Sequence, residues 1–213
     1  LIPTGSQDPF ALRRQTLGII NILIKGKYNL ILMPVLLTAM ERLNVCSSDR
    51  SNLLNSIVEF IEGRLKTVLL DEGIRYDVVD TIMNGEDSVY HIWLKCQALM
   101  QEIDSSYLPM TIAAFSRAGN LADKAKTCVV DPDLFVEESE MILYQTLLKQ
   151  EEEIQHFANG QDFVGVLGCL AKMIKPINEF FEAIMVMAED EAVRNNRLAL
   201  LKQVTKLSNV IGD

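Results

Sequence analysis

Helical periodicity is the feature that most constrains how this 213-residue chain can fold. Between residues 176 and 188, apolar side chains recur every three or four positions, the spacing that places them on one face of an α-helix. They are Ile177, Phe180, Phe181, Ile184, Met185 and Ala188. Pro176 fits the first helical position, where a proline costs no hydrogen bond. The pattern predicts a helix that packs this apolar face against a core.

Similar periodicity runs through the whole chain, and the alternation typical of β-strands is nearly absent. Helices are predicted near residues 10–24, 32–43, 51–69, 76–83, 88–103, 107–126, 138–158, 163–174 and 176–188, with a last one across 193–211. The expected class is all-α, a multi-helix bundle. No sequence period of about 30 to 50 residues is present, which weighs against a solenoid of repeats.

Turn residues divide the pattern into two parts. Gly85, Glu86, Asp87 and Ser88 separate two runs of strongly periodic helix, so we expect two helical subdomains, 1–86 and 87–213. Short acidic segments are predicted to cap helices at their N-termini. They are Asp8 before Pro9, Asp77, Asp131 before Pro132, and the acidic corner at 189–191.

Composition excludes several classes of protein. A hydrophobic content of 49% with 23% charged residues is ordinary for a folded protein. The longest apolar stretches, 17–24 and 30–40, are well short of the roughly 18 residues that span a bilayer, and no signal peptide is visible. Because the first residue is not Met, we expect a fragment or processed product. The four separated cysteines indicate buried thiols in a reducing compartment.

The formal charge of −9 argues against indiscriminate binding to nucleic acid. Residues 1–106 carry 10 basic and 13 acidic side chains, and residues 107–213 carry 10 and 16. Within this acidic chain, 9–40 and 192–212 contain basic residues and no carboxylate. These segments could contact polyanions, or they could be solvated helix faces that pair with nearby acids.

The sequence shows no catalytic constellation. His91 and His156 are the only histidines, and neither belongs to a metal-binding or catalytic motif. Gly18, Gly26 and Lys27 have the wrong spacing for a phosphate-binding loop. The acidic runs are expected to be solvated faces and caps rather than cation sites. We therefore expect no catalytic residue, no metal site and no cofactor in this chain.

Several motifs carry a resemblance to a known family. The run FFEAIMVMAED at 180–190, followed by RNNRLALL at 194–201, resembles the C-terminal end of the β subunit of bacterial-type glycyl-tRNA synthetase. DPFALRR at 8–14, IRYDVVD at 74–80 and FSRAGNLADK at 115–124 are similar to the same family. The resemblance implies that the second subdomain is a helical, DALR-type anticodon-binding domain.

The resemblance also implies a function and partners. The expected role is non-catalytic recognition of tRNA(Gly) at or near the anticodon, with the ATP- and Mg-dependent aminoacylation carried out elsewhere in the enzyme. The expected partners are tRNA(Gly) and the α subunit or an α-like region, with neither membrane nor DNA. The expected compartment is the bacterial cytoplasm, with an organelle as the alternative. The rival interpretation is a helical protein-protein assembly module without direct RNA contact.

Candidate RNA contacts lie on the predicted helix 107–126. Arg117, Asn120 and Lys124 stand on one flank of its apolar stripe, where they could present a guanidinium, an amide and an ammonium to RNA. Phe115 and Arg117 are candidates for stacking on unpaired bases. The alternative for Phe115 is a second packing face.

The last predicted helix offers a second group of candidates. Its core stripe consists of Val193, Leu200, Val204, Leu207 and Ile211. Asn195, Lys202 and Lys206 fall on the opposite side, where they could meet phosphate. Arg197 lies at the edge of the stripe, and we expect it to pair with Glu189 or Asp190 rather than to touch RNA.

Overall fold

A computed structural model describes residue 8 and residues 10–45, 50–83 and 88–212. These residues form ten α-helices and two short 3₁₀-helices, and no strand occurs among them. The all-α class is therefore confirmed. In this described part of the chain, no helix is long and apolar enough to cross a membrane.

The chain divides into two compact units, residues 1–100 and 101–213. The division falls near the end of α5 (Val89–Glu102). The boundary predicted at 86/87 falls on residues 84–87, which lie outside the described part. Each unit has its own set of buried apolar side chains.

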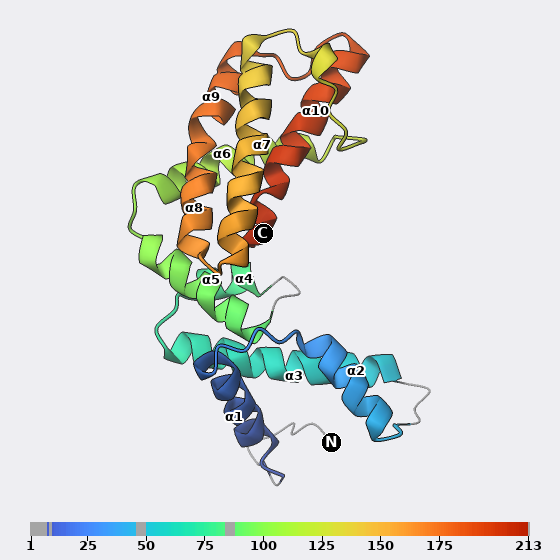
Figure 1. Cartoon of the computed structure of the whole chain (residues 1–213), viewed down its shortest axis with the longest axis vertical. Helices are drawn as coiled ribbons and strands as arrows, with labels where there is room; N and C mark the ends of the chain where they lie inside the picture. Colours follow the sequence, from blue (N-terminus) through green and yellow to red (C-terminus); the bar gives the residue numbers. More distant parts are fainter. Residues whose placement is uncertain (1–7, 9, 46–49, 84–87, 213) are drawn as a thin grey trace. The chain divides into compact units, whose positions relative to one another are not determined.

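The first unit is built around its longest helix, α3 (Arg50–Asp71), against which α1 (Leu12–Lys25), α2 (Leu32–Arg42) and α4 (Tyr76–Ile82) pack (Figure 1). Its buried side chains include Ile20, Leu23, Leu54, Ile61, Leu65 and Leu69. The predicted cap of the first helix is confirmed in part. The helix begins at Leu12 with Ala11 at its N-cap position, but the Asp8 carboxylate accepts hydrogen bonds from the N–H groups of Leu12 (2.8 Å) and Arg13 (3.1 Å). Gly73 ends the long helix with a positive φ of 86°.

The second unit contains α6 (Tyr107–Ala122), α7 (Glu138–Asn159), α8 (Phe163–Lys172), α9 (Ile174–Ala183) and α10 (Glu191–Lys206). Two 3₁₀-helices, η1 (Pro132–Leu134) and η2 (Ser208–Val210), lie between α6 and α7 and after α10. The helices α8 and α9 follow each other with only Met173 between them, and α7 lies beside both (Figure 1). On the other side of the core, α6 packs against α10, α9 and α8.

The helix predicted across 176–188 is only partly correct. The observed α9 starts at Ile174, so Pro176 is its third residue, and it ends at Ala183. Beyond it the chain is extended, with φ −128° and ψ 135° at Ile184. Ile184 and Val186 are buried while Met185 is 78% exposed. This alternation is that of an extended segment. Met185, which the helical pattern placed in the core, is therefore exposed, and Val186, which the pattern left out, is buried.

The predicted caps at Asp190 and Asp131 are confirmed, and the one at Asp77 is confirmed only in part. The Asp190 carboxylate accepts a hydrogen bond from the Val193 N–H (3.0 Å) at the start of α10. Asp131 caps η1 by accepting from the Asp133 N–H (3.0 Å), although the helix it starts is a single 3₁₀ turn. Asp77 is the second residue of α4 and Arg75 holds the N-cap position, but the Asp77 carboxylate accepts from the Val78 N–H (3.1 Å) in the first turn. Each carboxylate satisfies an N–H that has no partner within its helix.

The cysteines agree in part with the prediction of buried thiols. Cys96 and Cys169 are buried, Cys128 is half-buried, and all three are free. Cys46 lies outside the described residues. Burial raises the pKa of the Cys96 thiol to about 12, which keeps it protonated and unreactive at neutral pH.

Candidate RNA-binding surface

The predicted flank of α6 is exposed. Ala114, Ala118 and Ala122 are buried on one side of this helix. Arg117, Asn120 and Lys124 point to solvent from the other, with Lys124 just beyond the last helical residue. The small buried alanines let α6 approach its neighbours closely. Long polar side chains are confined to the opposite face for the same reason, since they have no room in the contact.

Arg117 has an aromatic partner that the sequence analysis assigned to a core stripe. Its guanidinium carbon lies 4.1 Å from the ring centroid of Phe181 on α9. Phe181 is half-buried and packs edge to face on the fully buried Phe180, with ring centroids 5.5 Å apart. A guanidinium over an aromatic face is attracted by the ring quadrupole. Arg117 is therefore held at the surface rather than left to swing freely.

Phe115 does not fit its predicted stacking role. Its side chain is only 8% exposed and belongs to the core of the second unit. A base cannot stack on a ring that is covered by other helices. The packing alternative is the one observed, because Phe115 lies on the buried side of α6, one residue from Ala114.

The candidates on α10 separate in the structure. Lys206 is exposed, and Asn195 is half-buried. Lys202 is also half-buried, and its ammonium donates a hydrogen bond to the carbonyl of Ala125 (3.3 Å), just past the end of α6. The predicted free side of α10 is thus narrow, because residues 196–201 of this helix are all buried.

The packing of α10 on α6 places the candidate residues of α6 and the candidate residues of α10 on different flanks of α6. The Thr205 side chain lies 4.0 Å from the Cβ position of Gly119, and Lys202 reaches Ala125, so the two helices are antiparallel here. Gly119 is turned by about 200° from Arg117 around α6. The exposed face of α6 therefore has Arg117 and α9 along one edge and α10, which carries Lys206, along the other.

Five of the ten basic side chains of the second unit are already paired with carboxylates. The ion pairs are Lys126 with Glu191 (3.4 Å), Lys149 and Lys172 with Glu153 (4.0 and 2.7 Å), Lys175 with Glu179 (3.5 Å), and Arg197 with Glu140 (2.8 Å). Among the described residues, no carboxylate forms an ion pair with Arg117, Lys124 or Lys206. These three cations border the exposed face of α6, and they keep their charge available for an external anion.

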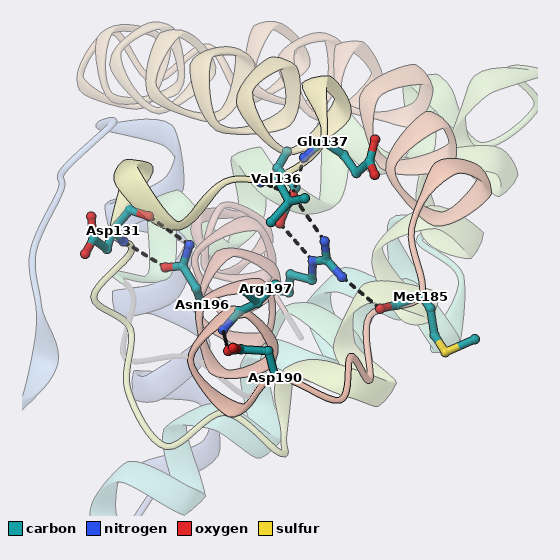
Figure 2. Close-up of polar contacts among 9 residues, drawn as sticks. Asp131, Val136, Glu137, Met185, Asp190, Asn196 and Arg197 are labelled. Carbon is teal, nitrogen blue, oxygen red and sulfur yellow. Dashed lines mark hydrogen bonds and ion pairs between the residues drawn. The ribbon is translucent and has the colours of Figure 1, made fainter.

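Arg197 pairs with a carboxylate, as predicted, but the partner is Glu140 rather than Glu189 or Asp190, and the pair is buried. The Arg197 guanidinium donates to both carboxylate oxygens of Glu140 on α7 (2.8 and 3.3 Å) and to the carbonyl of Met185 (3.0 Å; Figure 2). The nearby acidic corner is bound instead by Arg194, which donates to the carbonyls of Ala188 (2.7 Å) and Glu189 (3.2 Å).

Several hydrogen-bond donors around Glu140 offset the effect of burial on its pKa. Burial alone would raise the pKa of this carboxyl group. The Arg197 guanidinium and the N–H groups of Glu137 (2.8 Å) and Val136 (2.9 Å) outweigh that effect and hold the pKa of Glu140 below its ordinary value. The side chain is therefore charged at neutral pH inside the fold.

Two amide side chains of α10 fix the connection between α6 and α7. The side-chain oxygen of Asn196 accepts a hydrogen bond from the backbone N–H of Asp131. The side-chain NH₂ of Asn196 donates to the backbone carbonyl of Asp131, and both distances are 2.8 Å (Figure 2). Gln203 donates to the Cys128 carbonyl (2.5 Å). Sequence reasoning missed these residues because their partners lie 65 and 75 positions away. The signal in the sequence was that both amides lie beside the apolar stripe of this amphipathic helix.

The described residues include no group of three or more His, Cys, Asp or Glu side chains that could hold a metal ion. The surface at α6 instead combines cations, an amide and an aromatic ring, which are groups that bind nucleic acid.

Comparison with known families agrees with this architecture. The model of the DALR anticodon binding domain matches residues 111–211, which lie in the second unit and include every candidate residue named above. The second unit is thus an anticodon-binding domain of the DALR class. The model of the glycyl-tRNA synthetase beta subunit matches residues 1–84.

Curated relatives extend the match over nearly the whole chain. The glycine–tRNA ligase beta subunit of Desulforamulus reducens is 37% identical over 215 residues, covering 99% of this chain and 31% of the relative. That of Halalkalibacterium halodurans is 34% identical over 206 residues, covering 94% of this chain and 30% of the relative. The chain belongs to the glycyl-tRNA synthetase β-subunit family, and it spans about a third of the length of these relatives.

Proposed function

We propose that this chain is the non-catalytic, tRNA-binding region of a glycine–tRNA ligase and that it recognises tRNA(Gly) at or near the anticodon. The observation that carries the proposal is the DALR anticodon binding domain at residues 111–211. Its α6 has an exposed face bordered by cations that pair with no carboxylate in the part of the chain that the structure describes. ATP- and Mg-dependent aminoacylation then takes place in parts of the enzyme outside this chain, in the bacterial cytoplasm.

The chemistry of the α6 face suits a single-stranded loop. Unpaired bases are bound by hydrogen bonds to their edges and by stacking on aromatic or guanidinium planes. Arg117 supplies such a plane, Asn120 supplies a donor and an acceptor, and Lys124 supplies a charge for phosphate. The negative charge of the rest of the unit disfavours other approaches of RNA and so restricts binding to this face.

A second proposed partner is the α subunit or α-like region of the synthetase. The first unit supports a protein contact because α1 and α2 expose large apolar side chains. Among them are Ile19 (49%), Ile22 (63%), Met33 (38%) and Leu37 (37%). Ile19 with Ile22 and Met33 with Leu37 are spaced to lie on one side of their helices. Exposed apolar faces of this kind mark protein interfaces more often than RNA interfaces.

The tRNA proposal is tested by fluorescence anisotropy with labelled tRNA(Gly) and the 213-residue chain. The comparison ligands are tRNA(Gly) with an altered anticodon and a tRNA with a different anticodon. The double variant Arg117→Ala, Lys124→Ala is expected to weaken binding to tRNA(Gly) by about tenfold or more, because a stacking plane and a phosphate contact are lost. The altered anticodon is expected to weaken binding of the unsubstituted chain.

The matched control is Lys149→Ala, Lys175→Ala, which removes the same charge from two lysines that are paired with Glu153 and Glu179. It is expected to change the affinity by less than about twofold. If both double variants bind tRNA(Gly) equally well, or if the anticodon makes no difference, anticodon recognition by this surface is ruled out. The assembly module would then be the better account of the chain.

A further inference from the structure

We propose that Arg117 and Phe181 together form a stacking platform for one unpaired base of the bound tRNA, and that Asn120 recognises the edge of that base. This inference rests on the proposed function, because it names the nucleotide contact made by the same surface. It assigns a role to Phe181, whose helical spacing alone places it in the core.

The platform is ordered before RNA arrives. Phe180 is 0% exposed, and the Phe181 ring packs on it edge to face at 5.5 Å, so Phe181 cannot rotate freely. Arg117 lies over Phe181 at 4.1 Å. An arginine on a helix surface normally has many rotamers, and fixing it on binding costs entropy. Here the contact with Phe181 has already restricted the guanidinium, so less entropy is lost when a ligand stacks on it.

The arrangement favours a base over a phosphate as the ligand of Arg117. One face of the guanidinium is covered by Phe181, and Arg117 as a whole is exposed, so the outer face is open to solvent. A flat surface open on one side fits a flat ring. A phosphate would instead take a bidentate contact along the guanidinium edge and would need no aromatic support beneath it.

The neighbouring side chains fit the rest of one nucleotide. Asn120 lies three residues further along the same face of α6, about 4.5 Å along the helix axis, and its amide offers both a donor and an acceptor. Lys124 lies a further turn along, where its ammonium can reach the adjoining phosphate. Asn120 therefore distinguishes one base from another, while Arg117 and Phe181 hold any base by stacking.

The test is a cycle that combines base removal with side-chain substitution. tRNA(Gly) molecules with a single abasic site at each position of the anticodon loop are titrated with the unsubstituted chain. At one position, removing the base is expected to weaken binding by about tenfold. In Arg117→Lys, which keeps the charge but not the plane, and in Phe181→Leu, the same base removal is expected to change affinity by less than about twofold.

Asn120→Ala provides a second readout. It is expected to reduce the preference for the natural base over the other three at that position while keeping the loss caused by the abasic site. Phe135→Leu is the matched control, because Phe135 is a half-buried aromatic residue of the same unit that packs on Tyr144, whereas Arg117 packs on Phe181. This control is expected to leave the cost of base removal at about tenfold.

The platform is ruled out if the effects of base removal and of Arg117→Lys or Phe181→Leu are simply additive at every position. It is also ruled out if both variants merely lower the melting temperature while the cost of base removal stays unchanged, since this is the behaviour of a purely structural pair. If the chain binds tRNA(Gly) but the effects are additive, only the stacking platform is ruled out. If the chain binds no tRNA, the proposed function is ruled out as well.

Discussion

Glu140, near the start of α7, links this helix to α10 and to the segment that precedes α7. Its carboxylate accepts hydrogen bonds from Arg197 of α10 and from the backbone N–H groups of Val136 and Glu137. Replacing Glu140 by Gln keeps the shape but leaves the buried Arg197 without a counter-charge. We expect Glu140→Gln to lower the free energy of unfolding by about 3–5 kcal/mol, the usual result of breaking one side of a buried pair. Urea denaturation followed by circular dichroism measures the loss, with the exposed Glu151→Gln on α7 as the control.

The same carboxylate gives the stability a definite pH dependence. Because the pKa of Glu140 in the fold lies below its ordinary value of 4.5, its contribution is complete above that value and is lost as the pH falls through the folded-state pKa. Denaturation between pH 7 and pH 3 should therefore show a steeper loss for the unsubstituted chain than for Glu140→Gln. Parallel curves for the two proteins would show that Glu140 does not contribute in this way.

Gly165 on α8 is required by close packing rather than by backbone conformation. A Cβ at this position would lie 2.5–2.8 Å from atoms of the Phe157 ring on α7. We expect Gly165→Ala to destabilise the chain by about 1–3 kcal/mol through overpacking. Gly168→Ala on the same helix meets nothing within 4 Å and should stabilise it by up to about 1 kcal/mol, because alanine favours the helix. Thermal unfolding measures both effects, and melting temperatures that shift in the same direction for the two variants would contradict this prediction.

At the scale of the element, α10 depends on the cap that starts it. Asp190 accepts from the Val193 N–H, and its charge lies at the positive end of the helix. Asp190→Ala should cost about 1 kcal/mol of stability. Glu189→Ala serves as the control, because only the backbone carbonyl of Glu189 takes part in the corner. Equal melting temperatures for the two variants would mean that the cap is unimportant to this helix.

At the scale of the whole molecule, a chain with a net charge of −9 should bind RNA through few phosphates. The slope of log affinity against log salt concentration is then modest, since each neutralised phosphate of a single strand contributes about 0.7 to it. Lys124→Ala should reduce the slope by about that amount, and Lys175→Ala should leave it unchanged. Anisotropy titrations at several salt concentrations measure both, and binding that does not depend on salt would exclude phosphate contacts.

Local pattern was enough to predict the class, most helices and the exposed flank of α6. The helices observed at Glu138–Asn159 and Val89–Glu102 lie within a residue of those predicted near 138–158 and 88–103. This success has a simple cause, because burial of one helix face imposes a 3.6-residue period that can be recognised in a single segment. Capping carboxylates are equally local, since they act on N–H groups a few positions away.

The choice of partner for each polar side chain was decided only by tertiary structure. Arg197 pairs with Glu140 rather than with the nearby Glu189 or Asp190, because helix packing brings a carboxylate 57 positions away into a buried site where the pair excludes water. Lys202 donates to the Ala125 carbonyl just past the end of α6, and Arg117 stacks on Phe181, for the same reason. Periodicity shows which face of a helix is covered, but only the packing of helices distant in the sequence determines what covers it.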